Sequence, residues 1–161
     1  MSYKNIELYF GEDHDRLDEY FKQFQLYKDS DFRKARESFK MFKLSLQRHI
    51  AWEEDVLFPV FEQKTGLHDT GPTAVMRLEH RQVERALEEI HKKVQRSDPS
   101  SDREEAALLQ LLKRHSDKEE NIVYPMLDEM TTREERSEMY AKMRNMPESR
   151  YKNCCGLHSH N

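Results

Sequence analysis

The chain has 161 residues, of which 36% are charged, and its formal net charge is −4. This length is typical of a single domain with a hydrophobic core, and the interleaving of both charge signs leaves no basic patch for nucleic acid. No apolar run approaches the roughly 20 residues that span a bilayer, and the first residues lack the apolar segment of a secretory signal. We therefore expect a cytoplasmic protein that binds neither nucleic acid nor membranes.

The first helix is predicted to run from about residue 12 to residue 28, after a leader of mixed apolar character. Glu12 and Asp13 follow Gly11, and acidic residues suit the start of a helix. Apolar and imidazole side chains then recur at three- and four-residue steps, as they do along one face of a helix. This inner face comprises His14, Leu17, Phe21 and Phe24.

A second helix is predicted from about residue 31 to residue 64, and Gly66 ends it. Its inner face alternates three- and four-residue steps, which is the pattern of helices packed in a left-handed bundle. Pro59 lies inside this pattern and removes one backbone hydrogen bond, so we expect a kink there. The predicted inner positions are Phe32, Ala35, Phe39, Phe42, Leu46, His49, Glu53, Leu57 and Val60.

Two further long helices are predicted at about residues 72–96 and 102–130, followed by a short helix at 132–145. The inner positions of the first are Met76, His80, Val83, Leu87, Ile90 and Val94. Those of the second are Leu108, Leu112, His115, Glu119, Ile122 and Met126. Residues 1–146 are then expected to form one domain and residues 147–161 a flexible tail.

Four histidines mark an internal repeat. His80 follows His14 by 66 residues, and His115 follows His49 by the same interval. We interpret the chain as two copies of a two-helix unit with one inward histidine on each helix. Two helical hairpins predict an all-α, antiparallel up-down-up-down four-helix bundle, and the cores of such bundles hold metal sites.

Two of these histidines are followed four residues later by a glutamate, His49 by Glu53 and His115 by Glu119. Four residues advance an α-helix by slightly more than one turn, so both side chains leave the same face. An unpaired carboxylate buried in an apolar core costs on the order of several kcal/mol. Coordination of a metal makes such burial favourable, so the pattern predicts a metal site.

The number of donors indicates two metals, because six side chains exceed the capacity of one tetrahedral zinc ion. Two irons bridged by the glutamates use all six groups, and manganese or zinc also suit imidazole and carboxylate ligands. Open coordination positions would take water, oxygen or another small ligand. The predicted ligands are His14, His49, Glu53, His80, His115 and Glu119.

Other acidic residues lie close to these ligands. Glu84, four residues after His80, is either a seventh ligand or lies just beside the inner face that Val83 occupies. Asp18 stands in the same relation to His14, but its shorter side chain competes with larger neighbours for the inner face. Three further glutamates adjoin ligands and are expected to form hydrogen bonds to histidines. They are Glu54, Glu79 and Glu120.

The order of these ligands resembles that of the bacterial hemerythrin-like (HHE cation-binding) domains over roughly residues 10–130. The Phe58-Pro59 and Tyr124-Pro125 pairs are similar to this family too. The resemblance implies a four-helix bundle around an oxo- or hydroxo-bridged di-iron centre, with Glu53 and Glu119 as bridging ligands. It also implies binding of oxygen or a related small molecule such as nitric oxide or peroxide.

Two positions depart from the oxygen-carrying hemerythrins. Those proteins have His-x3-His on the third helix, where this chain has His80 and Glu84, and His-x4-Asp on the fourth, where it has His115 and Glu119. Carboxylate-rich sites hold ferric iron and favour redox turnover. Peroxidase or oxidase activity is therefore an alternative to oxygen binding, and a metal that only stabilises the bundle is another.

The end of the chain carries two adjacent cysteines, Cys154 and Cys155, together with His158 and His160. They either belong to a loose tail or form a thiol pair for redox chemistry or metal transfer. The Cys-Cys-Gly run is similar to one in iron–sulfur repair proteins, which carry a hemerythrin-like domain, although there it precedes the bundle. This resemblance implies iron handling with a redox or iron–sulfur protein as partner.

Overall fold

The computed structural model describes residues 5–152, and helix is the only regular secondary structure among them. This confirms the all-α class expected from the sequence. Within that part of the chain, no helix has the length and apolar character needed to cross a membrane. The elements are α1 (Ile6–Tyr27), α2 (Phe32–Trp52), the π-helical turn η1 (Glu53–Leu57), α3 (Phe58–Thr65), α4 (Pro72–Gln95), α5 (Asp102–Lys118), the π-helical turn η2 (Glu119–Val123), α6 (Tyr124–Met130), α7 (Arg133–Arg144) and the 3-10 turn η3 (Glu148–Arg150).

The first helix begins at Ile6, earlier than the acidic residues near position 12 suggested. Asn5 caps it, because the Asn5 side chain accepts a hydrogen bond from the backbone N–H of Leu8 at 2.8 Å. The Asp128 carboxylate accepts two further bonds, from the backbone N–H groups of Ile6 and Glu7. These acceptors satisfy N–H groups that a helix start leaves free, so part of the apolar leader joins the helix.

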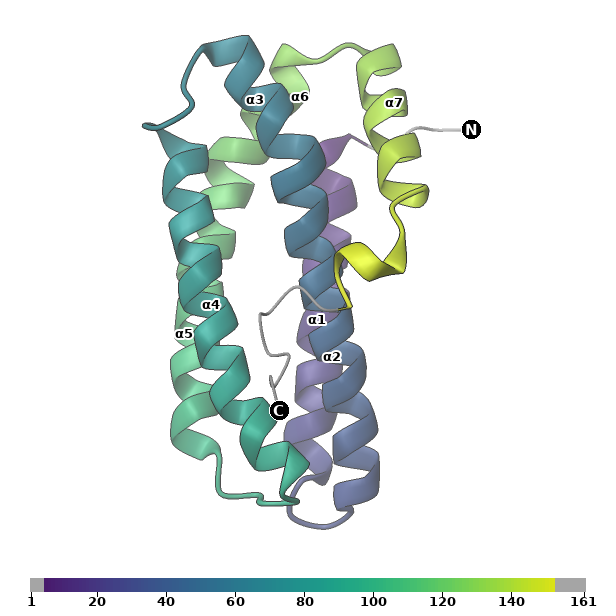
Figure 1. Ribbon diagram of the computed structural model, residues 1–161, viewed down its shortest axis with the longest axis vertical. Helices are drawn as coiled ribbons and strands as arrows, with labels where there is room; N and C mark the ends of the chain where they lie inside the picture. The colour runs from purple at the N-terminus through teal and green to yellow at the C-terminus, as the bar shows by residue number, and fades with distance from the viewer. Residues whose placement is uncertain (1–4, 153–161) are drawn as a thin grey trace.

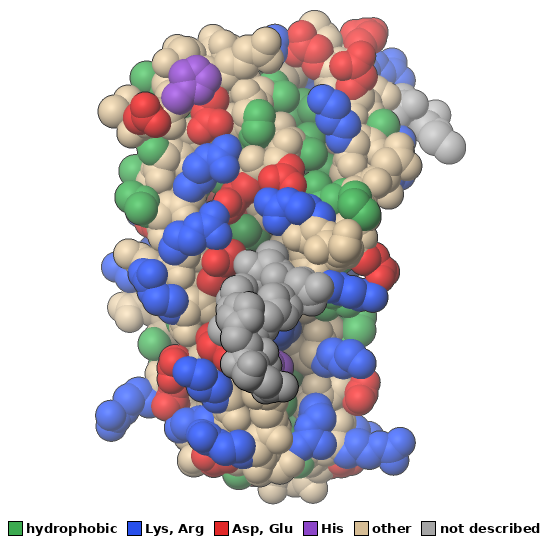
Figure 2. Space-filling view, viewed as in Figure 1, with side chains coloured by type: hydrophobic (Ala, Val, Ile, Leu, Met, Phe, Trp, Pro, Cys, Tyr) green, Lys and Arg blue, Asp and Glu red, His purple; other side chains and the backbone are tan. Residues whose placement is uncertain are grey.

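The four longest helices, α1, α2, α4 and α5, run lengthwise beside one another, and α3 and α6 lie together at one end of the molecule (Figure 1). α1 packs on α2, α4 packs on α5, and α1 also contacts α6. α7 lies at the same end and buries Met139, Tyr140 and Met143. Basic and acidic side chains are interspersed over the face shown in Figure 2, as the sequence indicated.

Two clusters of buried apolar side chains lie on either side of the predicted ligands. The first cluster is at the α7 end and includes Phe58 and Tyr140, and the second includes Phe39. α1, α2 and α4 contribute to both clusters, whereas α5 contributes to the second alone; on α4, for example, Met76 belongs to the first and Val83 to the second. Burial of one such side chain contributes roughly 1.5–3 kcal/mol. Apolar packing therefore stabilises the protein on both sides of the predicted ligands.

Both prolines inside the long helical stretches are preceded by a π-helical turn, η1 before Pro59 and η2 before Pro125. Proline lacks an N–H group, and its ring clashes with the carbonyl four residues earlier in an α-helix. In η1 the N–H of Phe58 reaches back five residues to the carbonyl of Glu53, and η2 repeats this bond at the equivalent positions. The wider turn accommodates the proline and the helix continues.

Each π-helical turn contains one more residue than an α-helical turn. After it, the positions that face the core are therefore shifted by one residue along the sequence. Ile122 and Met126, which were predicted to face the core, are 46% and 37% exposed. Val123 and Leu127 take their places and are fully buried, as is Phe61 after the first turn. The prediction for Ile122 and Met126 is wrong because three- and four-residue steps assume an uninterrupted α-helix.

A buried ion pair joins Lys28, the residue that follows α1, to α5 at the end away from α7. The Lys28 ammonium contacts the Glu105 carboxylate at 2.5 Å, and the two side chains are 6% and 2% exposed. Lys28→Met is expected to lower the free energy of unfolding by about 3 kcal/mol, because it leaves the buried Glu105 carboxylate without a positive charge beside it, although the hydrogen bonds from Gln25 and Ser101 remain. Lys28→Met with Glu105→Leu is expected to regain most of this loss, since apolar side chains then replace both charges. Urea unfolding of the metal-loaded variants measures both effects, and a double variant no more stable than the single one would contradict the expectation.

Candidate metal centre

The structure brings the six predicted ligands together between the two apolar clusters. Each of the four long helices contributes one histidine, and η1 and η2 contribute the glutamates. The donors form two overlapping groups, and within each group the donor atoms lie within 4.8 Å of one another. One group is Glu53, His80, His115 and Glu119, and the other is His14, His49 and Glu119.

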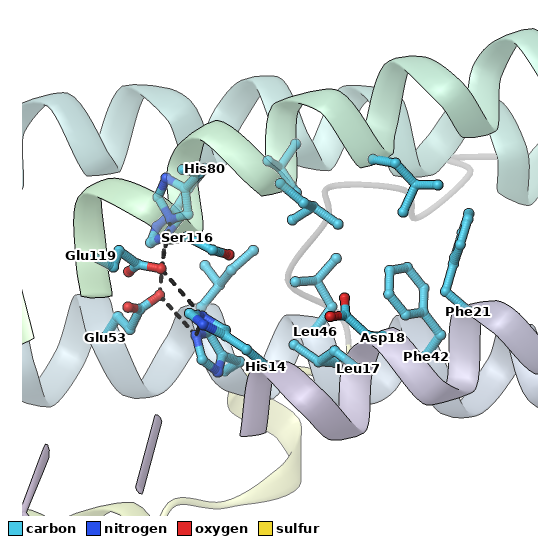
Figure 3. A pocket seen from close by; sticks show the side chains of 16 residues that line it. His14, Leu17, Asp18, Phe21, Phe42, Leu46, Glu53, His80, Ser116 and Glu119 are labelled. Atoms are coloured by element: carbon cyan, nitrogen blue, oxygen red, sulfur yellow. Dashed lines mark hydrogen bonds and ion pairs between the residues drawn. The ribbon is translucent and has the colours of Figure 1, made fainter. Parts of the chain in front are cut away.

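The two glutamates lie side by side at the middle of this cluster, as Figure 3 shows for Glu53 and Glu119 between His80 and His14. The Oε1 atom of each glutamate lies 3.3 or 3.4 Å from the Nε2 atom of one histidine from each repeat. These contacts join Glu53 to His49 and His80, and Glu119 to His14 and His115. Each carboxylate is thus placed to connect the two halves of the repeat.

Five buried polar atoms of the cluster make no hydrogen bond to any residue in the range 5–152. They are Oε1 of Glu53, both carboxylate oxygens of Glu119, and Nε2 of His80 and of His115. Buried polar atoms without a partner are rare and destabilising. The four residues that carry these atoms form one donor group, so a metal ion bound there would give donor atoms of all four a partner. The donor set fits a bound cation.

In all four histidines of the centre, Nδ1, the ring nitrogen that faces away from Glu53 and Glu119, forms a hydrogen bond with a carboxylate. The Nδ1–oxygen distances are between 2.7 and 3.1 Å. The pairs are His14 with Glu120, His49 with Asp13, His80 with Glu54, and His115 with Glu79. Because a carboxylate accepts the Nδ1 proton, Nε2 is left free to bind a metal, and the ring is fixed in orientation.

Asp13 is the one member of these pairs that the sequence analysis missed, since it was assigned to the acidic start of a helix. It lies on α1, is 1% exposed and accepts a hydrogen bond from His49 of the next helix at 2.7 Å. Burial opposes its ionisation, but the contact with His49 lowers the pKa of Asp13 to about 2. The repeat interval of 66 residues relates Asp13 to Glu79, and this relation was the signal that could have identified it.

Burial and neighbouring charge act in opposite directions on the imidazoles. Burial lowers the pKa of His14, but the contact with Glu119 outweighs it and raises that pKa to about 9. Burial likewise opposes the contact with Glu53 at His80, whose pKa is raised to about 10. Burial and the negative charge of Glu119 also raise the pKa of Glu53. A metal ion must therefore displace protons from the cluster in order to bind.

Comparison with known families agrees with this geometry. The model of the hemerythrin HHE cation binding domain matches residues 9–127, which include all six predicted ligands. The chain belongs to the hemerythrin HHE cation-binding family. The match confirms the resemblance drawn from the ligand order, and the two His/Glu groups of this hemerythrin-like protein fit the metal site of a cation-binding domain. No curated protein and no solved structure shows significant similarity to the chain.

Tyr124 closes the centre of this hemerythrin-like protein on the side of the first cluster. It is fully buried and donates its hydroxyl proton to Oε2 of Glu53 at 2.7 Å. Its oxygen also lies 3.4 Å from Nε2 of both His14 and His49. Burial and the charges of Glu119 and Glu53 raise the pKa of Tyr124 well above its ordinary value. The phenol therefore stays protonated and remains a donor to Glu53.

Tyr124→Phe is expected to preserve the metal count but to weaken metal affinity by roughly tenfold, in the range found when groups that orient ligands are removed. The reason is that Glu53 loses the hydrogen bond that fixes its carboxylate. Competition with a chromophoric chelator measures the affinity. Tyr20→Phe, at a partly buried tyrosine packed on the second cluster, is the matched control. An affinity equal to that of the parent would show that the hydroxyl does not orient Glu53.

Glu84, the possible seventh ligand, lies outside both donor groups. Its carboxylate oxygens accept hydrogen bonds from the Arg81 guanidinium at 3.0 and 3.1 Å. Asp18 is also outside these groups, although it lines a cavity beside the centre. The structure thus gathers six of the seven predicted ligands and places Glu84 in an ion pair.

A cavity of about 30 Å³ adjoins the six ligands and extends toward the second cluster (Figure 3). One water molecule needs at least roughly 10–15 Å³ of such space, so the cavity suits a ligand of only a few atoms. Apart from the ligands, Asp18 and Ser116 are its polar lining residues. Its remaining walls are apolar and comprise Leu17, Phe21, Phe42, Leu46, Ile50, Val83, Leu109 and Leu112.

Proposed function

We propose that this protein is a non-haem di-iron protein that binds oxygen, or a related small molecule such as nitric oxide or peroxide, in the core of an antiparallel up-down-up-down four-helix bundle. The observation that carries the proposal is the position of the two glutamates, each of which faces one histidine of each repeat. Donors shared in this way suit two adjacent cations better than one. One iron would be held by His14 and His49, the other by His80 and His115, and both by Glu53 and Glu119.

The residues of the chain prepare this site in three ways. The carboxylates behind the histidines fix every Nε2 toward the centre. The Tyr124 hydroxyl donates a hydrogen bond to Oε2 of Glu53 and fixes the orientation of that carboxylate. The apolar walls exclude bulk water and limit the ligand to a few atoms. Iron bound there would supply reversible redox chemistry and open coordination positions.

The test is to load the protein with ferrous iron in the absence of oxygen, count the metal, and record the visible spectrum as oxygen is admitted. We expect two irons per chain and an oxygen-dependent band that disappears when oxygen is removed. The same protein loaded with zinc is the control and should show no such band. Fewer than two irons per chain would overturn the dinuclear proposal, and irreversible oxidation would favour peroxidase or oxidase turnover over binding.

One alternative raised by the sequence, redox turnover, receives less support from the structure. Redox turnover was tied to coordination by Glu84, and that carboxylate is held by Arg81. Delivery of iron to iron–sulfur centres, with a redox or iron–sulfur protein as partner, depends on Cys154 and Cys155. These cysteines lie outside the described residues.

Glu84→Ala is expected to leave both the metal count and the visible spectrum of the iron-loaded protein unchanged. The reason is that the Glu84 carboxylate is engaged by Arg81 and belongs to neither donor group. Metal analysis and absorption spectroscopy of the variant check this directly. Loss of one metal, or a shifted spectrum at full occupancy, would establish Glu84 as a ligand and revive the alternative of redox turnover.

A further inference from the structure

The four carboxylates that hold the histidines are not equally restrained. In three of the four pairs, a basic side chain at the surface binds the carboxylate from outside. These ion pairs are Arg16 with Asp13, Arg81 with Glu54, and Lys118 with Glu79. A carboxylate bound on both sides holds its histidine firmly, because moving the histidine would break a charged network.

Glu120, which holds His14, is the exception. Among residues 5–152 no basic side chain forms an ion pair with Glu120, and His14 is its partner. The Glu120 side chain is 41% exposed, whereas the exposure of the other three carboxylates lies between 1% and 19%. His14 is 11% exposed, more than any other predicted histidine ligand. The centre is therefore least enclosed at His14 and Glu120.

The surface outside Glu120 is hollowed and acidic. A cavity of about 500 Å³ lies against it, and no basic residue in the described part of the chain lines this cavity. The Glu7, Asp15 and Glu120 carboxylates would raise the local concentration of divalent cations, as clefts of one charge sign do. The lining residues are Asn5, Glu7, Leu8, Gly11, Glu12, Asp15 and Glu120.

We propose that the metal held by His14 and His49 is the exchangeable one of the two, and that divalent cations reach and leave it past Glu120. The acidic cavity is the outer part of this route and not a second metal site. A hydrated cation meets the exposed Glu120 carboxylate first. His14 can then turn toward the cation, because no basic side chain among the described residues restrains Glu120, which holds His14. The histidines of the other metal, His80 and His115, are held by carboxylates that basic side chains bind from outside. That metal therefore exchanges more slowly. This inference rests on the dinuclear centre proposed above.

The first test follows the release of ferrous iron from the loaded protein to a chromophoric chelator without oxygen. The parent is expected to release its two irons in two phases. Glu120→Gln should accelerate the fast phase by on the order of tenfold, because it weakens the hydrogen bond that orients His14. Glu54→Gln is the matched variant, since residue 54 holds His80 and is the repeat equivalent of residue 120. It should accelerate the slow phase and leave the fast one unchanged.

The second test concerns the route and touches no histidine or its carboxylate. Glu7→Lys with Asp15→Lys reverses two exposed charges at the cavity. After partial release of iron, this variant should take ferrous iron up again on the order of tenfold more slowly at low salt, and the difference should shrink at high salt. Glu89→Lys with Asp117→Lys makes the same change in net charge on α4 and α5 and should rebind iron at the parental rate.

The outcomes separate this inference from the proposed function. A protein with fewer than two irons per chain would refute the dinuclear centre itself. Two irons that leave at one common rate, or Glu120→Gln and Glu54→Gln variants that accelerate the same phase, would overturn the exchange route alone. So would equal slowing of uptake by both charge-reversed pairs, because the effect would then follow net charge and not the cavity.

Discussion

Replacement of Glu119 by alanine is expected to abolish the binding of both metals. Glu119 is the residue shared by the two donor groups, and its Oε1 atom faces His14 of the first repeat and His115 of the second. Both oxygens are buried without a hydrogen-bond partner among the described residues, so metal ions are the groups they are placed to bind. Removing a bridging ligand weakens both sites at once, whereas a terminal ligand serves only one.

The contrast with His115→Ala makes this expectation specific. His115 belongs to one donor group, so the variant should lose one metal and keep the one at His14 and His49. Metal analysis after gel filtration counts the ions, and far-ultraviolet circular dichroism verifies that the helices remain. Glu88→Ala, at a glutamate on α4 outside both groups, should retain two metals. Two metals in Glu119→Ala would show that this carboxylate does not bridge.

The donor set could be predicted because its signal is local and repeated. A glutamate four residues after a histidine shares a helix face with it whatever the tertiary structure is, as His49 with Glu53 illustrates. The interval of 66 residues then relates the histidines of the two halves. Glu84 shows the limit of this reasoning. Spacing places it near the face of His80, but the neighbouring Arg81 determines what its carboxylate binds.

The π-helical turns could not be predicted from periodicity alone. Pro59 and Pro125 indicated a disturbed backbone, but a missing N–H group is compatible with a kink or with a wider turn. The wider turn changes the phase of all later residues, which is why Val123 and Leu127, and not Ile122 and Met126, face the core. Each proline is therefore accommodated by a π-helical turn with one extra residue, and the helical backbone continues through it.

The role of Asp13 was hidden for a different reason. Asp13 holds His49, which lies on another helix and 36 residues away along the chain. Such a pair depends on the relative rotation of α1 and α2, and sequence spacing within one helix carries no information about it. The start of α1 at Ile6 is similar, since Asp128 of α6 binds its first turn. Contacts between helices decided the role of Asp13 and, together with the local Asn5 cap, the start of α1.

Metal affinity is expected to rise steeply with pH, by up to about a hundredfold per pH unit from about pH 6.5 to about pH 9, since each displaced proton contributes tenfold per unit. In the folded, metal-free protein the pKa of His14 is raised to about 9 and that of His80 to about 10. Both imidazoles are therefore protonated at neutral pH, and a metal ion must displace both protons. Binding in weakly buffered solution should release them, and a pH indicator measures the amount.

The free energy of unfolding of the metal-free protein is expected to fall as pH rises. The two histidines have raised pKa values in the folded state, so their contribution is fully present below the ordinary value of 6.5 and is lost as pH rises through about 9 and about 10. The metal-loaded protein keeps neutral imidazoles bound to metal, so its stability should exceed that of the metal-free form by a growing margin as pH rises. Urea unfolding of both forms from pH 6.5 to pH 10 measures this margin. A constant margin would mean that metal binding displaces no protons, so that His14 and His80 are already neutral in the metal-free protein.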